Sequence, residues 1–173
     1  LVEQPAAVIQ RHIVVHRHPG HGRLMGAIQE TTREKVNRLE DALRSVPQVD
    51  CPIRHHFAPG IYAREITIPK GTVLTGAVHK QESLVVLSAG RLRLVTDDGT
   101  VEISAPYTLT CKAGAKNAAL ALEDSVWTNF FATEETDQDK LVELLTESKA
   151  SDLLGGDTNQ QLAANKAAEI TEA

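Results

Sequence analysis

Aromatic residues are scarce in this chain: one Trp, two Tyr and three Phe make up 3% of its 173 residues. So small a number leaves few rings on which a sugar or a nucleotide base could stack. Long hydrophobic runs are also missing, since none reaches the roughly 18 residues that a membrane-spanning helix needs. These two absences disfavour a sugar-stacking surface and a membrane protein.

Cysteine and positive charge are in short supply as well. Cys51 and Cys111 match neither a zinc knuckle nor a Cys-x-x-Cys redox motif, so we expect two free thiols in a reducing compartment. The formal net charge is −5, whereas nucleic-acid binding needs a basic face that displaces counterions from phosphates. The N-terminus lacks the basic, apolar and small-residue order of a secretory signal. We therefore expect no nucleic-acid partner, no membrane contact and no secretion.

The length and the 42% hydrophobic content allow one sizeable core with flanking arms, and we expect a single folded domain. Changes in composition predict five segments: an irregular arm at 1–30, a helix at 31–47, a β-barrel at 50–133, a helix at 134–154 and an acidic, Ala-rich tail at 155–173. Four histidines lie in the arm, namely His12, His16, His18 and His21. They are compatible with a metal cluster, but we favour an arm that reaches onto a neighbouring subunit.

Both predicted helices carry local start and stop signals. Thr31-x-x-Glu34 has the form of a capping box, and Pro47 ends the segment that follows it. Thr136-x-x-Asp139 marks the second start. The apolar residues expected on the buried faces are Val36, Leu39, Leu43 and Val46 in the first helix and Leu141, Leu144 and Leu145 in the second.

Between the helices the pattern is that of short β-strands. Residues 91–96 alternate polar and apolar side chains, as half-buried antiparallel strands do, and Asp97-Asp98-Gly99 is a tight-turn signal. Further runs predict strands at 61–68, 73–78, 83–88, 100–104, 107–111, 119–122 and 126–132. About eight short strands, without a helix of crossover length between them, predict a mainly β fold, either a jelly roll or a small barrel.

The stretch 71–90, GTVLTGAVHKQESLVVLSAG, indicates two strands joined at a hairpin-like corner. Its spacing resembles the first signature of the cupin superfamily, Gly-x5-His-x-His-x3-Glu-x6-Gly, in which the two His and the Glu bind a metal ion. In this sequence those three positions hold Ala77, His79 and Ser83. The resemblance covers about residues 58–133 and implies a single cupin-type jelly roll of about eight antiparallel strands.

The second cupin signature, Gly-x5-Pro-x-Gly-x2-His-x3-Asn, can be placed on residues 106–121. Gly114 agrees with it, but Asn117 stands where the fourth metal ligand would be. A divalent transition metal needs about three or four protein ligands, so we expect no metal cofactor. The alternative is a site of His79 and Glu82, although Glu82 lies one residue out of register and would need a bulge to face the same side. The candidates for a metal-free ligand pocket are His79, Gln81, Ser83 and Asn117.

Catalysis without a metal would require an acid and a base in a pocket. Some metal-free cupins isomerise or epimerise sugar nucleotides with a His and a Tyr. The resemblance makes His79, Tyr62 and His56 the catalytic alternatives, with His55 and Tyr107 as further His and Tyr residues of the barrel. The sequence identifies no dyad among them, so we expect no catalytic residue. Trp127, in EDSVWTNFF, is most simply a packing residue.

Three segments more closely resemble a group of small cupin-like proteins that recur in tailed-bacteriophage genomes: FAPGIYAREITIPKGTVLTGAVHK, HKQESLVVLSAG and LEDSVWTNFFATEETD. Members of that group tend to carry additional His at the positions of Gln81 and Ser83. The emptied ligand set and the long flanks favour a non-enzymatic structural or interaction module of a virion or similar assembly. Its location would be the virion or the host cytoplasm, and its partners other virion or assembly proteins.

The alternative function is a small-molecule- or metal-binding cupin enzyme of the isomerase, epimerase or dioxygenase type. In either case we expect a homo-oligomer, a dimer or a trimer. Pairing of copies hides the sheet edges that would otherwise promote aggregation.

Overall fold

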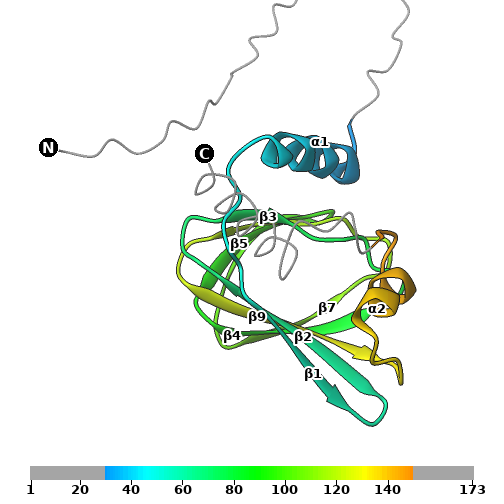
Figure 1. Ribbon diagram of the computed structural model, residues 1–173. Helices are drawn as coiled ribbons and strands as arrows, with labels where there is room; N and C mark the ends of the chain where they lie inside the picture. Colours follow the sequence, from blue (N-terminus) through cyan, green and yellow to red (C-terminus); the bar gives the residue numbers. More distant parts are fainter. Residues whose placement is uncertain (1–29, 150–173) are drawn as a thin grey trace, which may run out of the picture.

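The computed structural model describes residues 30–149. Within this range, nine strands form two antiparallel sheets that face each other, and helices α1 and α2 flank them (Figure 1). The strand order is β1-β2-β9-β4-β7 in one sheet and β3-β8-β5-β6 in the other. The mainly β jelly roll predicted from the sequence is therefore confirmed, although the two sheets do not close into one continuous barrel. The tail predicted at 155–173 and residues 1–29 of the predicted arm, with its four histidines, lie outside the described residues.

The elements follow one another along the chain in a simple order. They are α1 (Thr32–Arg44), β1 (Ile53–Ala58), β2 (Ile61–Ile68), β3 (Val73–Thr75), β4 (Ser83–Ala89), β5 (Arg91–Thr96), β6 (Gly99–Ser104), β7 (Tyr107–Cys111), β8 (Ala118–Ala121), β9 (Ser125–Ala132) and α2 (Gln138–Leu145).

Helix α1 begins at the capping box that the sequence predicted. The amide of Glu34 donates to the Thr31 hydroxyl (3.2 Å), and the amide of Thr31 donates to the Glu34 carboxylate (2.8 Å). The helix ends at Arg44, so Val46 lies beyond it and is 49% exposed, contrary to the expected apolar stripe. Figure 1 shows α1 lying across the end of the molecule where β3 is found.

A carboxylate joins α1 to the strands beneath it. Glu40 accepts a hydrogen bond from the Thr75 hydroxyl of β3 (2.9 Å) and another from the ammonium of Lys116. Lys116 is buried and precedes β8 in the sequence. Burial acts to raise the pKa of Glu40, but the hydrogen bonds from Lys116, Thr75 and Arg44 outweigh it and hold the pKa below its ordinary value. The helix is thus fixed to the region of β3 and β8 by polar contacts, and its one buried residue is Val36.

Helix α2 is shorter than the segment 134–154 that the sequence indicated. Its N-cap is Asp137, whose carboxylate accepts from the amide of Lys140 (3.1 Å). Leu141 and Leu145, four residues apart on one face, are buried, whereas Leu144 is 52% exposed, contrary to expectation. The two buried leucines pack with Tyr62 and Phe131 of the five-stranded sheet.

Two features of the strands differ from the sequence expectation. Strand β1 was not predicted, because IRHHFA carries two His and one Arg in an edge strand that is mostly exposed. Strands β3 and β4 lie in different sheets, so the predicted hairpin-like corner at 71–90 is wrong as a pairing. The chain instead crosses between the sheets at residues 76–82, and His79 lies on this crossing.

The core consists of two clusters of buried residues. The larger contains Cys51, Ile66, Ile68, Leu87, Leu92, Leu94, Ile103 and Ala121, drawn from both sheets. The smaller contains Tyr62, Phe131, Leu141 and Leu145, where α2 covers the five-stranded sheet. Members of both clusters line the space between the sheets.

Candidate ligand-binding site

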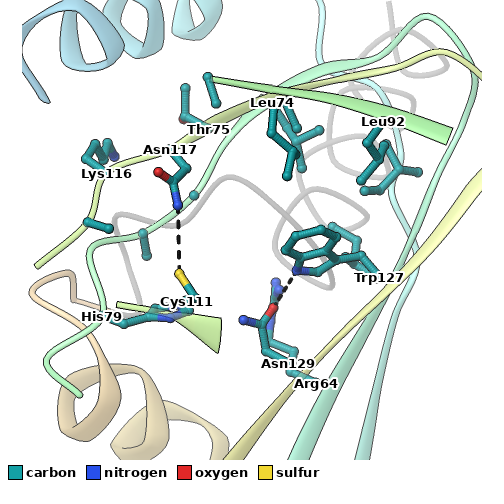
Figure 2. A pocket seen from close by; sticks show the side chains of 18 of the residues that line it. Arg64, Leu74, Thr75, His79, Leu92, Cys111, Lys116, Asn117, Trp127 and Asn129 are labelled. Carbon is teal, nitrogen blue, oxygen red and sulfur yellow. Dashed lines mark hydrogen bonds between the residues drawn. The ribbon is translucent and has the colours of Figure 1, made fainter. Parts of the chain in front are cut away.

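A cavity of about 1010 Å³ lies between the two sheets. Pockets for small organic molecules commonly measure roughly 300–1,000 Å³, so the space is large enough for such a ligand. Its wall combines apolar side chains such as Leu74 and Leu92 with polar and charged groups (Figure 2). The arrangement of those polar groups follows from the register of the five-stranded sheet.

Side chains two residues apart on a strand share a face, so cross-strand partners on the inner face form rows. The central row of the five-stranded sheet runs through His55 on β1, Arg64 on β2 and Asn129 on β9, which are direct partners. The row on one side contains Ile66 and Trp127, and the row on the other side contains Phe57, Tyr62 and Phe131. The sheet therefore presents a polar row between two apolar rows.

Arg64 carries the charge of this row. Figure 2 shows its side chain behind Asn129 at the wall of the cavity. Within residues 30–149, neither an ion pair nor a hydrogen bond joins its guanidinium to another group. Burial lowers the pKa of Arg64 from its ordinary value, and the neighbouring Tyr62 opposes this effect. Because arginine stays protonated in proteins, the site holds a poorly solvated positive charge.

Asn129 and Trp127 are held rigidly beside Arg64. The indole Nε1–H of Trp127 donates to Asn129 Oδ1 (2.7 Å), and the Asn129 amide donates to the hydroxyl of Ser83 (3.3 Å). The first of these bonds fixes which end of the amide faces the indole, so the amide nitrogen is directed toward Ser83 on β4. Trp127 thus lines the cavity in addition to packing against the larger core cluster.

His79 lies at the α2 end of the cavity. Its carbonyl accepts from the amide of Gly114 (2.8 Å), and a β-bridge pairs it with Thr146 just after α2. Its Nδ1 is 3.4 Å from the Ser83 hydroxyl oxygen. Its ring packs edge to face against the ring of Phe131, with 5.2 Å between the ring centroids. Burial, followed by the charge of Arg64, lowers the pKa of His79.

The other predicted pocket residues lie in different places. Asn117 lines the cavity and donates to Cys111 Sγ (3.8 Å), on the same side as His79 in Figure 2. Ser83 is buried and contacts both His79 and Asn129 without reaching the cavity surface. Gln81 is exposed to solvent and does not line the cavity.

A cupin metal centre does not fit these residues. The four signature positions hold Ala77, His79, Ser83 and Asn117, which supply one imidazole and no carboxylate. Glu82, the alternative ligand, is exposed. Among residues 30–149 no group of three or more His, Cys, Asp or Glu side chains is placed to hold a metal ion. We therefore derive no chemistry at this site from a bound metal.

The residues predicted as catalytic alternatives are not all close to one another in the structure. Tyr62 contacts His55 and not His56, with 2.7 Å between its phenolic oxygen and His55 Nδ1. His56 lies on the outer face, 3.6 Å from Glu65. Burial raises the pKa of Tyr62, with Arg64 acting in the opposite direction, so its hydroxyl is a poor base at neutral pH. The His55–Tyr62 pair could relay a proton, but its strongest feature is stacking with Phe57 and Phe131.

No family model and no curated protein matches this chain. Similar solved structures include the cupin domain of an XRE family transcriptional regulator from Enterobacter cloacae, with 10% identity and a TM-score of 0.43 over 50% of this chain and 100% of that chain. An RmlC-like cupin from Shewanella frigidimarina has 14% identity and a TM-score of 0.42 over 51% of this chain and 87% of that one. KdgF from Halomonas sp. has 16% identity and a TM-score of 0.42 over 49% of this chain and 80% of that one.

The fold is a mainly β jelly roll of two facing antiparallel sheets. The spacing of the first signature implied a single jelly roll of about eight antiparallel strands, and the described residues form nine antiparallel strands in two facing sheets. The low identities say nothing about a ligand or an activity, so function is argued from this chain's own residues. Among the described residues no helix is long and apolar enough to cross a membrane.

Arg64 and Asn129 are not among the site residues predicted from the sequence. A signal was available, because both stand in alternating runs whose same-face neighbours are apolar or aromatic. In YAREITI the face of Tyr62 and Ile66 includes Arg64, and in VWTNFFA the face of Trp127 and Phe131 includes Asn129. A charged residue in the inward register of a barrel strand is the pattern to look for.

Proposed function

We propose that this chain is a non-enzymatic cupin-like module that binds a small organic molecule between its two sheets, directly through side chains. The observation that carries this proposal is the polar row of His55, Arg64 and Asn129 facing a cavity of about 1010 Å³. A few converging polar groups in a largely apolar pocket are typical of ligand sites.

The chemistry of the wall supports binding better than turnover. The raised pKa of Tyr62 makes its hydroxyl a poor base at neutral pH, and no acidic side chain lines the five-stranded-sheet side of the cavity among the described residues. The rigid placement of Trp127 and Asn129 suits a preformed site.

Native mass spectrometry of the full chain purified from cells tests this function. We expect a small molecule that is released on denaturation. Ala119→Phe places a ring in the cavity wall and should abolish retention, whereas Ala132→Phe, at an exposed position of β9, should preserve it. The proposal fails if the wild-type protein retains no molecule and no member of a metabolite collection raises its melting temperature.

As a second function we propose an oligomeric component of a tailed-phage virion or assembly, of which an exposed apolar face supports only the contact with another protein. The outer face of the five-stranded sheet exposes Leu84 (49%) beside Phe130, its cross-strand partner, and Ile61 is 50% exposed on β2. Neighbouring exposed apolar groups suit contact with another protein surface. If that face joins copies of the chain, Leu84→Glu should lower the mass measured by light scattering, while Val73→Glu, on the other sheet, should not.

A further inference from the structure

We propose that the molecule bound in the cavity is a monocarboxylic acid with an apolar body, and that Arg64 binds its carboxylate. This inference rests on the proposed binding function and specifies the chemical class of the ligand. It is carried by the charge balance of the cavity, by the position of Arg64 and by the character of the remaining wall.

The charge balance singles out one group. The cavity is lined by four Lys or Arg side chains, Arg44, Arg64, Lys112 and Lys116. Arg44 and Lys116 both pair with Glu40, and Lys112 lies 3.6 Å from Asp98. Among the described residues, Arg64 is therefore the cavity cation without an acidic partner.

Acidic groups are absent from the part of the wall around Arg64. The acidic residues lining the cavity within residues 30–149 are Glu40 on α1 and Asp97 and Asp98 in the β5–β6 turn. The five-stranded sheet contributes none. On the outer face of this sheet, in contrast, Arg54 of β1 pairs with Glu65 of β2 (3.5 Å). The same two strands therefore provide an acidic partner for the outward-facing Arg but none for the inward-facing Arg64.

A poorly solvated guanidinium without an ion-pair partner is costly unless an anion binds it. Its planar fork matches the two oxygens of a carboxylate, which can accept two parallel hydrogen bonds. A single positive charge balances a single negative charge, so a carboxylate suits this site better than a phosphate monoester, which carries close to two charges at neutral pH.

The rest of the wall fits an apolar body. Ile66 and Trp127 form the row next to Arg64, and Leu74, Leu92 and Leu94 face them from the four-stranded sheet. Figure 2 shows Leu74, Leu92 and Trp127 gathered on one side of the cavity, with Arg64 below. A carboxylate at Arg64 would place the apolar part of its molecule against these side chains.

The test is a titration of the full chain followed by tryptophan fluorescence, because Trp127 is the sole Trp of the sequence and lines the cavity. The probes are octanoate, the neutral octan-1-ol of equal chain length, and inorganic phosphate. We expect saturable binding of octanoate that is about tenfold or more tighter than that of octan-1-ol, and no response to phosphate.

Three variants locate the effect. Arg64→Gln should weaken octanoate binding by about ten- to a hundredfold and leave octan-1-ol unchanged, since a charged hydrogen bond is lost. Arg64→Lys keeps the positive charge but loses the planar fork of the guanidinium, so its affinity for octanoate should lie between those of the wild type and Arg64→Gln. Arg54→Gln, which removes an Arg from the outer face of the neighbouring strand, should bind octanoate as the wild type does. Circular dichroism confirms that each variant is folded.

The possible failures are distinguishable. Equal binding of octanoate and octan-1-ol, unaffected by Arg64→Gln, would overturn the carboxylate inference while supporting a neutral ligand. Loss of octanoate binding in Arg54→Gln as well would show a general charge effect and also overturn it. If octanoate does not bind at all, this inference is wrong, and native mass spectrometry then decides the proposed binding function independently.

Discussion

Arg64 and Asn129 are direct partners across β2 and β9, and both line the cavity, yet no hydrogen bond joins their side chains among the described contacts. The Asn129 oxygen is already engaged by Trp127 at 2.7 Å. This polar cross-strand partner therefore does not satisfy the guanidinium of Arg64, and the cost of that charge to stability should be measurable.

Replacing Arg64 should stabilise the protein in the absence of ligand. Arg64→Met keeps much of the side-chain volume and removes a half-buried charge that has no ion-pair partner among residues 30–149, so we expect the free energy of unfolding in urea to rise by about 1–3 kcal/mol. Arg93→Met, at an exposed position paired with Glu102, should change it by less than about 0.5 kcal/mol. Destabilisation by Arg64→Met would mean that the guanidinium has a structural partner.

The pH dependence of stability should contain a contribution from His79. Burial and the charge of Arg64 lower its pKa below 6.5, so the unfolded chain takes up a proton more readily than the folded one. The contribution of neutral His79 to the free energy of unfolding is fully present above about pH 6.5. It is lost as the pH falls toward the pKa of His79 in the folded protein. Urea unfolding of wild type and His79→Gln between pH 5 and 7.5 should show a wild-type advantage that shrinks with falling pH. A difference independent of pH would contradict this.

Gly90 should be intolerant of any side chain. Its φ of +80° disfavours L residues, and a Cβ there would lie 2.2 Å from the carbonyl oxygen of Asp124. Gly90→Ala should lower the free energy of unfolding by clearly more than about 1 kcal/mol. Gly114→Ala shares the strain (φ +77°) but meets no atom within 4 Å, so the difference between the variants measures the clash. Equal losses would show that strain alone acts.

Neighbouring leucines of α2 provide a test of how this helix is oriented. Leu145 is 3% exposed and packs in the cluster with Tyr62 and Phe131, whereas Leu144 is 52% exposed. Leu145→Ala should cost about 2–4 kcal/mol of unfolding free energy, and Leu144→Ala less than about 0.5 kcal/mol. Thermal or urea unfolding of the two variants is sufficient. Similar losses for both would mean that α2 contacts the sheet through another face.

The fold could be predicted from the sequence because its signals are local. The capping box at Thr31 and Glu34 and the turn at Asp97-Asp98 act through neighbouring residues, and both were identified correctly. Strand β1 escaped prediction because its polar residues face solvent at a sheet edge. The hairpin-like corner at 71–90 was wrong because spacing along the chain does not reveal which sheet a strand joins.

The site was less accessible to sequence reasoning. The family spacing drew attention to His79, Ser83 and Asn117; His79 and Asn117 line the cavity, whereas Ser83 is buried behind its wall and contacts His79. Arg64 and Asn129 come together only through the pairing of β2 with β9, which joins residues more than sixty positions apart. The alternating runs indicate that each of these side chains faces inward, but the whole fold decides which strands pair and so brings the two residues together.

Strand β9 is the last strand in the chain but occupies the middle of the five-stranded sheet, between β2 and β4. During synthesis, the edges of β2 and β4 that pair with β9 therefore stay unpaired until residues 125–132 have left the ribosome. Contacts so distant in sequence slow folding, because the loop must close before they form. A nascent chain that stops short of Ser125 would lack the strand that unites the sheet, and we expect folding of the barrel to be a late, all-or-none event.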